Sequence, residues 1–530
     1  MSQERQVARR AGGVSAATMV SRVLGLVREQ VMAGLFGAGL ATDAFNVAFR
    51  IPNLVRDLVA EGAMSSAFIP AFTEERRKRG EPEAFRFGAH LILALGLGLS
   101  LLCLVAGLAA PALVAAMAPG FGAIPGKLEL TVLLTRVMLP FLPLLAMAAA
   151  LMGMLNAHGR FTGPALAPAV QNVLMVVVGL ALIPLCHSFG QPEVLAMAIG
   201  VTAGALGQFL WQLPPLVVMG FRFHWEWPFS DPAVRRVAMR MVPATIGLAA
   251  TQLNLFVSTL VASLLPQGSV SWLWYAFRLM QLPIGVFGVA LATVSLPELS
   301  RAAVDNDAAR LKTTLSATLR LVALLTIPAA FGLAALSQPL IVLLYEHGRF
   351  TPVDTLATSR ALVMYCVGLP AFAAVGVLTR TFYALGDTRT PVQATFVAVA
   401  LNIALNLALM RPLGHLGLAL ATSLTSIANL LQLTFLLRRR IGPIEGGRAL
   451  STVLRVGVAG ALAGAVVLPG ALALTGRWRG TLLLELLGTS LLGLAFLAVC
   501  WFIMRRLRVA EVATLEDLVR GLKRRLLPPR

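Results

Sequence analysis

The sequence predicts an all-α polytopic membrane protein with fourteen transmembrane helices. Its 530 residues are 58% hydrophobic and only 13% charged, and the mean hydropathy is +0.81. Apolar runs of roughly 20 residues, the length that crosses a hydrocarbon core as a helix, recur from one end of the chain to the other. Several arginines nevertheless lie inside such runs. Because a charge at mid-membrane depth costs about 2.5–3.5 kcal/mol, we expect these arginines to face a water-filled cavity.

Clusters of charged residues, prolines and glycines separate the apolar runs and delimit the expected spans. The run that follows residues 1–10 continues into Ser21 and Arg22 without a small-residue cleavage pattern, so we expect a first span rather than a cleaved secretory signal. The fourteen expected spans lie near residues 12–37, 41–71, 86–118, 129–155, 162–186, 193–220, 236–265, 269–297, 313–337, 353–384, 390–410, 414–437, 451–475 and 481–504.

Lysine and arginine are distributed unevenly between the two sides of this map. One side collects the N-terminus, the basic loop at 76–86 and the tail after 505, whereas the opposite side holds only Lys127, Arg349, Arg411, Arg477 and Arg479. Basic residues accumulate in cytoplasmic loops, so we expect both termini in the cytoplasm. The net charge of +20 is therefore attributed to membrane orientation rather than to nucleic-acid binding. The basic tail after Arg505 fits either an amphipathic helix on anionic headgroups or a solvated segment.

Landmarks of the first half recur in the second half. Residues 48–51 (AFRI) match 276–279 (AFRL), the AxG at 157–159 matches 384–386, and Pro164 matches Pro391, all at nearly the same offset. Two halves with an even number of spans keep the same orientation, which predicts two six-helix lobes in parallel repeat around a central cavity. The expected domains are an N-lobe at 1–222 (helices 1–6), a C-lobe at 223–440 (helices 7–12), and residues 441–530 with helices 13–14 and the basic cytoplasmic tail.

Catalytic and metal-binding patterns are absent from the sequence. It contains no GxSxG, HExxH or P-loop motif, and its six histidines have no carboxylate partner at helical spacing. The four cysteines stand singly in apolar segments, which favours buried thiols over disulfides or a zinc site. We therefore expect neither an enzyme nor a cofactor.

The first two spans carry the strongest functional signal. Arg22 and Arg28 are six residues apart, roughly 9 Å along a helix axis, and can line one broad face at two depths. The second span adds four further candidate residues: Asp43, Arg50, Arg56 and Glu61. Membrane charges often pair with one another, so a second interpretation is that they serve only as structural contacts, for instance Arg28 with Asp43 or Arg56 with Glu61.

The eighth span adds Arg278, which is the repeat mate of Arg50 and is expected to face it across the cavity. Guanidinium groups stay charged at any cellular pH, and their planar donor fork matches two phosphate oxygens. Several of them in one cavity suit a pyrophosphate better than a monovalent anion. Arginines in later spans, Arg136, Arg360 and Arg380, are expected to snorkel or to bond between helices, with ligand contact as the other possibility.

At these residues the chain resembles the MurJ (MviN-type) lipid II flippases of the multidrug/oligosaccharidyl-lipid/polysaccharide exporter superfamily. The motifs that carry the resemblance are SRVLGLVRE at 21–29, the segment at 36–72, GSVSWLWYAFRLMQLPIGVFGVAL at 268–291, and HGRFT at both 158–162 and 347–351. The resemblance implies fourteen helices, with the last two forming a hydrophobic groove for a polyprenyl tail.

The resemblance also implies a function. A flippase of this family carries lipid II, the undecaprenyl-pyrophosphate-linked disaccharide-pentapeptide, across the inner membrane by alternating access. Its cavity arginines correspond to Arg22, Arg28, Arg56 and Arg278, and its cavity acids to Asp43 and Glu61. The expected partners are the lipid-linked substrate, membrane lipids and enzymes of cell-wall synthesis. The alternative is an exporter of another lipid-linked oligosaccharide, or of drugs or cations, with the same architecture.

Overall fold

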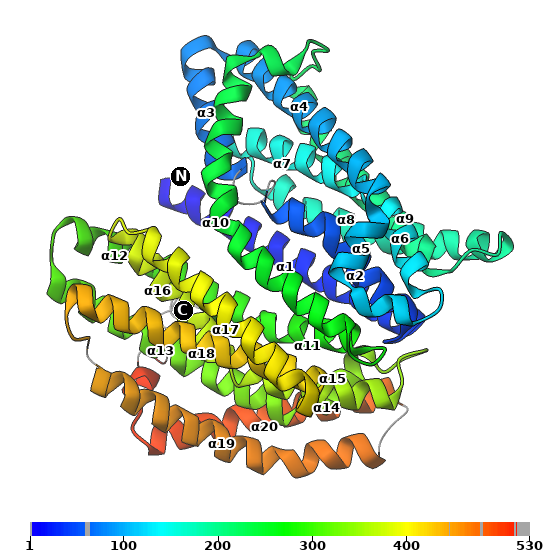
Figure 1. Cartoon of the computed structure of the whole chain (residues 1–530). Coiled ribbons are helices and arrows are strands. Elements are labelled where there is room, and N and C mark those ends of the chain that lie inside the picture. Colours follow the sequence, from blue (N-terminus) through cyan, green and yellow to red (C-terminus); the bar gives the residue numbers. More distant parts are fainter. Residues whose placement is uncertain (1–2, 59–63, 445, 478–480, 514–515, 517–530) are drawn as a thin grey trace, which may run out of the picture. The chain divides into compact units, whose positions relative to one another are not determined.

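The computed structural model of the protein describes residues 3–58, 64–444, 446–477, 481–513 and 516. In these residues all regular secondary structure is helical and no strand occurs, so the predicted all-α class is confirmed. The helices form two compact units, Met1–Ser271 and Trp272–Arg530, which are described separately (Figure 1).

The first unit contains ten α-helices among its described residues. They are α1 (Gln3–Phe36), α2 (Leu40–Arg56), α3 (Met64–Arg79), α4 (Glu81–Leu108), α5 (Ala110–Met117), α6 (Lys127–Met138), α7 (Phe141–Ala157), α8 (Thr162–Ser188), α9 (Val194–Val218) and α10 (Pro232–Ser263). Short 3-10 helices, η2 (Pro119–Ala123) and η3 (Pro228–Ser230), precede α6 and α10.

Glycine sets the packing of α8 against α9. A Cβ atom on Gly200 would lie 2.4 Å from the carbonyl oxygen of Met175, and one on Gly204 would lie 2.6 Å from that of Gln171. The two backbones therefore touch directly, as small residues allow in membrane helices. In the same unit, aromatic residues of α3 and α4 build a core with Phe68, buried and 5.6 Å from the ring of Phe87.

The second unit contains the remaining helices. They are α11 (Ser269–Pro283), which begins at the end of the first unit, the π-helical turn η4 (Ile284–Gly288), α12 (Val289–Val304), α13 (Ala308–Ala335), α14 (Ser337–Tyr345), α15 (Pro352–Cys366), α16 (Leu369–Ala384), α17 (Arg389–Leu413), α18 (His415–Ile441), α19 (Gly446–Arg477) and α20 (Leu482–Arg506). Helices α13, α19 and α20 share one apolar core that includes Leu324, Ala463 and Phe496.

Prolines interrupt three of the spans that were predicted as continuous. Pro111 lies in the first turn of α5 and Pro370 in the first turn of α16, and Pro140 immediately precedes α7. Proline lacks the N–H that a continuous helix requires and clashes with the preceding turn. The pair α15 and α16 is consequently bent by 44°. In the predicted span 41–71, α2 ends at Arg56 and α3 begins at Met64; residues 59–63 lie outside the described residues.

Ten helices of the described residues are long and apolar enough to cross a membrane, or eleven when the bent pair of α15 and α16 is taken as one span. The chain is therefore a multi-pass membrane protein. Grouping by contacts places α10 with the first unit, in which it packs on α3, α4 and α5. The predicted lobes were divided by sequence duplication, whereas these units are divided by contacts between residues. The lobe boundary at 222/223 and the parallel repeat therefore stay predictions.

Candidate functional site

Six of the seven candidate residues are described by the structure. Glu61 lies outside the described residues. Five candidates, Arg22, Arg28, Asp43, Arg50 and Arg56, belong to the first unit, and Arg278 belongs to the second. The surroundings of each are therefore given within its own unit.

Arg28 lies at the interface between α1 and α8 and is only 8% exposed. Its Nη1 donates to Asn172 Oδ1 at 3.2 Å, and its Nη2 pairs with the carboxylate of Glu29. Asn172 in turn donates to the carbonyl oxygen of Ser21 at 3.4 Å. The suggested pairing of Arg28 with Asp43 is wrong. The charge on Arg28 is instead balanced by its own neighbour in sequence, and Asn172 forms hydrogen bonds between α8 and α1.

Asp43 occupies the centre of a second buried network, at 1% exposure. Its Oδ2 accepts from Lys127 Nζ at 2.9 Å and from the Gly268 N–H at 2.8 Å. Its Oδ1 accepts from the N–H and the hydroxyl of Ser271, at 3.0 and 2.6 Å. A carboxylate with four donors is fully satisfied. Asp43 therefore joins α2 to the start of α6, to the turn that follows α10 and to the first turn of α11.

Lys127 is the residue that the sequence analysis missed at this network. It was counted only among the basic residues of a loop, yet its side chain is 2% exposed, and its ammonium lies 4.1 Å from the centroid of the Phe121 ring. A buried charge requires a partner of opposite sign. No periodicity signal pointed to Asp43 as that partner, because the two residues are 84 positions apart.

Arg50 and Arg56 both connect α2 with α10. Arg50 Nη1 donates to Thr259 Oγ1 at 2.6 Å and to the Leu255 carbonyl at 3.3 Å. Arg56 Nε donates to Asp57 Oδ1 at 3.0 Å, and Gln252 donates to the other oxygen of Asp57 at 3.3 Å. These contacts hold both guanidinium groups in place, so cargo binding at Arg56 would require exchange with Asp57.

Arg22 and Arg278 are the exposed members of the candidate set. Within the described residues, no hydrogen bond or ion pair involves the side chain of Arg22. The guanidinium of Arg278 lies 5.5 Å from the ring centroid of Trp274, one turn earlier on α11. An arginine over a tryptophan face is held in part by a cation–π attraction.

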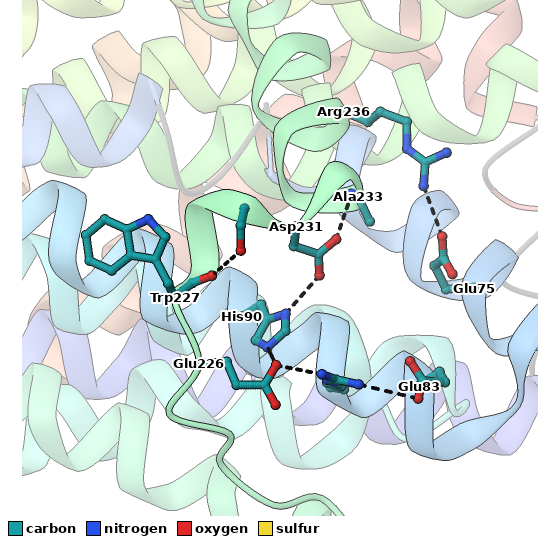
Figure 2. A network of polar contacts seen from close by, with 10 residues as sticks. Glu75, Glu83, His90, Glu226, Trp227, Asp231, Ala233 and Arg236 are labelled. Atoms are coloured by element: carbon teal, nitrogen blue, oxygen red, sulfur yellow. Dashed lines mark hydrogen bonds and ion pairs between the residues drawn. The ribbon is translucent and has the colours of Figure 1, made fainter.

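A polar network joins the start of α10 to α3 and α4 (Figure 2). His90 is 6% exposed; its Nδ1 lies 2.9 Å from Asp231 Oδ2 and its Nε2 lies 3.6 Å from Glu226. Arg86 donates to the same Glu226 carboxylate at 2.6 Å, and this hydrogen bond lowers the pKa of Glu226. Asp231 also caps α10 by accepting from the Ala233 N–H at 2.8 Å.

This network was not foreseen because His90 and Asp231 are 141 positions apart, far beyond helical spacing. A sequence signal did exist, since Asp231 followed by Pro232 is a typical start of a helix. Among the described residues, no three His, Cys, Asp or Glu side chains are placed to hold a metal ion.

Comparison with known proteins identifies the family. The family model described as "Lipid II flippase MurJ" matches residues 32–488. A relative from Vibrio cholerae serotype O1, named "Probable lipid II flippase MurJ", is 39% identical over 424 residues, which cover 79% of this chain and 80% of the relative. The chain belongs to the MurJ family of lipid II flippases.

A solved structure agrees with this assignment to the MurJ family. One described as "Lipid II flippase MurJ, inward closed conformation" is 27% identical, with a TM-score of 0.75 over 93% of this chain and 99% of that one. A multidrug transporter of the MATE family in an inward-facing conformation is 16% identical, with a TM-score of 0.67 over 82% of this chain and 99% of that one. The second likeness concerns the fold alone.

This MurJ family member has an apolar groove in its second unit. The groove has a volume of about 760 Å³ and lies between α13, α20 and the π-helical turn η4. Its lining includes Phe287, Leu325, Leu333, Leu497 and Trp501 and no charged side chain. Such a surface suits a hydrocarbon chain, because each methylene that stays out of water avoids a cost of about 0.8 kcal/mol.

Proposed function

We propose that this chain carries lipid II across the cell inner membrane for peptidoglycan synthesis. The observation that carries the proposal is the family match over residues 32–488. The proposed activity is transport by binding and release, without a chemical step and without a cofactor. Lipid II and membrane lipids are the proposed ligands, and enzymes of cell-wall synthesis are proposed partners.

The proposed architecture has fourteen spans with both termini in the cytoplasm. Eleven spans come from the apolar helices when α15 and α16 count as one. The three further spans would be α1, α2 with α3, and α10. Helices α1 and α2 carry Arg22, Arg28, Arg50 and Arg56. Charged residues lower the hydropathy of a helix but do not prevent its insertion into the membrane when they face a polar cavity. Two six-helix lobes in parallel repeat and two additional C-terminal helices complete the proposal.

The pyrophosphate of the cargo is proposed to bind the cavity arginines. Arg22 and Arg278 are exposed and are the proposed first contacts. Arg28 and Arg56 each neighbour a carboxylate, so the cargo would take the place of Glu29 and Asp57 as the anionic partner. Charge-assisted bonds from several guanidinium groups favour a doubly charged ligand.

The remaining candidates are proposed to shape the cavity. Arg50 and Asp43 hold α2 against its neighbours. Glu61, which comes later in the chain, is proposed to shape the same cavity. The polyprenyl tail is proposed to lie in the groove between α13 and α20, with its lining of apolar side chains. Rocking of the two lobes would then open the cavity alternately to the cytoplasm and the periplasm.

Export of drugs or cations is a second possible function for this fold, and it has weaker support. Cationic cargo requires acidic residues in the cavity, whereas the exposed candidates here are arginines. The likeness to a MATE transporter is at 16% identity. An exporter of a different lipid-linked oligosaccharide keeps the pyrophosphate chemistry and is separated by the experiment below.

The test is complementation of bacteria depleted of their own lipid II flippase. We expect the wild-type chain to restore growth and to expose lipid II at the outer face, as measured by its accessibility to an added periplasmic enzyme. Arg22→Ala and Arg278→Ala should fail in both assays at normal protein levels, whereas Arg360→Ala, which removes an exposed arginine of α15, should succeed. Full rescue by both cavity variants would remove the cargo-binding role. Failure of the wild-type chain at normal levels would favour a different lipid-linked cargo.

A further inference from the structure

A second groove lies on the first unit, on the face formed by α4, α6 and α7. It has a volume of about 620 Å³. Its lining is mostly apolar, with Ser100 and one cation, Arg136, as the polar members, and it includes Leu104, Leu108 and Leu139. Leu104 and Leu108 are 63% and 75% exposed. Large leucines left open on a membrane helix face hydrocarbon rather than water.

The chain break between α6 and α7 forms one wall of the groove. Leu139 and Pro140 separate the two helices, and both line the groove. Because Pro140 has no N–H, the helix cannot continue across it with regular hydrogen bonds.

Arg136 lies in the groove with much of its guanidinium available. Its Nε donates to the carbonyl oxygen of Gly107 at 2.9 Å, which orients the planar fork. Within the described residues, no carboxylate pairs with Arg136, and no acidic side chain lines the groove. The site therefore carries one uncompensated positive charge beside an apolar channel, and it is complementary to a ligand with one negative charge and a hydrocarbon chain.

The depth of this charge matches the headgroup layer. Arg86 is the last charged residue on the basic side of α4. From there to Gly107 is about 21 residues, or roughly 31 Å at the rise of an α-helix, which is about the thickness of a hydrocarbon core. The Gly107 carbonyl and the Arg136 guanidinium thus lie near the opposite headgroup layer, at the level of a phospholipid phosphate.

We propose that this groove binds one anionic phospholipid of the outer leaflet. Arg136 binds the phosphate, Gly107 orients the guanidinium, and an acyl chain fills the groove along Leu104 and Leu139. The site lies wholly in the first unit and uses none of the candidate cargo residues. It takes the proposed topology for the choice of leaflet and is independent of the proposed transport of lipid II.

Native mass spectrometry of the purified full-length chain with phosphatidylglycerol tests the proposal. We expect Arg136→Ala to weaken the tightest phosphatidylglycerol adduct about tenfold, and Arg411→Ala, which removes another exposed arginine on the same predicted side, to leave it unchanged. A second variant, Gly107→Leu, fills the groove and keeps the charge, since the nearest atom to an added Cβ is Leu139 Cδ1 at 3.6 Å. It should lose the adduct as well. Phosphatidylethanolamine, which has no net charge, should bind weakly to all variants.

Three outcomes would overturn the proposal. They are an unchanged adduct in Arg136→Ala, an equal loss in Arg411→Ala, or equal binding of phosphatidylethanolamine and phosphatidylglycerol by the wild-type chain. Thermal unfolding of each variant in detergent shows whether it is folded before its lipid binding is compared. If Arg136→Ala does not fold, Arg136→Gln, which keeps a donor and removes the charge, takes its place with the same expected result.

Discussion

Removing either charge of the buried pair Asp43 and Lys127 should destabilise the protein strongly and non-additively. Both side chains are at most 2% exposed. Breaking a buried pair by removing one partner costs about 3–5 kcal/mol, because the other charge is left uncompensated. In Lys127→Met, Asp43 keeps three donors, from Gly268 and Ser271. We therefore expect a loss near 3 kcal/mol for this variant.

Asp43→Ala should cost more, about 5 kcal/mol, since it leaves the Lys127 ammonium and the donors of Gly268 and Ser271 without their acceptor. In the double variant no orphan charge remains. Its loss should therefore be smaller than the sum of the two single losses by about 2–3 kcal/mol, a coupling within the range for groups in direct contact.

The free energies of this cycle are measured by unfolding the purified variants in mixed micelles. The helical signal is recorded as the fraction of denaturing detergent increases. Single losses that add to the double loss within about 0.5 kcal/mol would refute the reasoning, because independent sites behave in that way. The same variants also bear on the predicted cargo role of Asp43. A transport defect at normal stability would favour cargo contact, and a defect that follows stability would favour a structural role.

Three further predictions concern other parts of the molecule. Arg28→Ala should destabilise by about 3 kcal/mol, because it removes the guanidinium that pairs with the buried Glu29 carboxylate. The Arg28→Ala/Glu29→Ala double variant should recover stability in the same detergent titration, yet remain inactive in complementation if Arg28 binds cargo. Gly200→Ala should lower the thermal unfolding temperature, since its Cβ would lie 2.4 Å from a carbonyl of α8, whereas Gly98→Ala, with no atom within 4 Å, should not; equal shifts would contradict the packing argument. The pKa of Asp387 is lowered chiefly by a hydrogen bond from a backbone N–H. Its charge therefore stabilises the fold fully above the usual aspartate pKa of about 3.9, and this stabilisation is lost as the pH falls through the lower pKa of the folded state. The difference in thermal unfolding temperature between wild type and Asp387→Asn should narrow below about pH 4, and a wider difference would argue against this linkage.

The sequence did not predict which prolines interrupt a helix. Pro52 lies inside α2, which continues through it to Arg56, whereas α6 and α7 separate at Pro140. Both prolines lack the same N–H. Whether a helix bends or breaks there depends on which neighbours donate a hydrogen bond to the freed carbonyl and pack against the kink. Those neighbours come from other parts of the chain, so the three interrupted spans could not be distinguished from continuous ones by composition.

The sequence by itself determined the membrane class and the approximate places of most helices, and it singled out the arginines that are proposed to bind cargo, because hydropathy and charge are properties of local segments. Only the tertiary structure decided what each charge touches. Arg28 meets Asn172 across 144 positions and Asp43 meets Lys127 across 84. A buried charge requires an opposite charge or a hydrogen-bond partner, but several residues of the sequence could meet that requirement equally well. The packing of helices selects one of them by distance, which periodicity along a single helix does not encode.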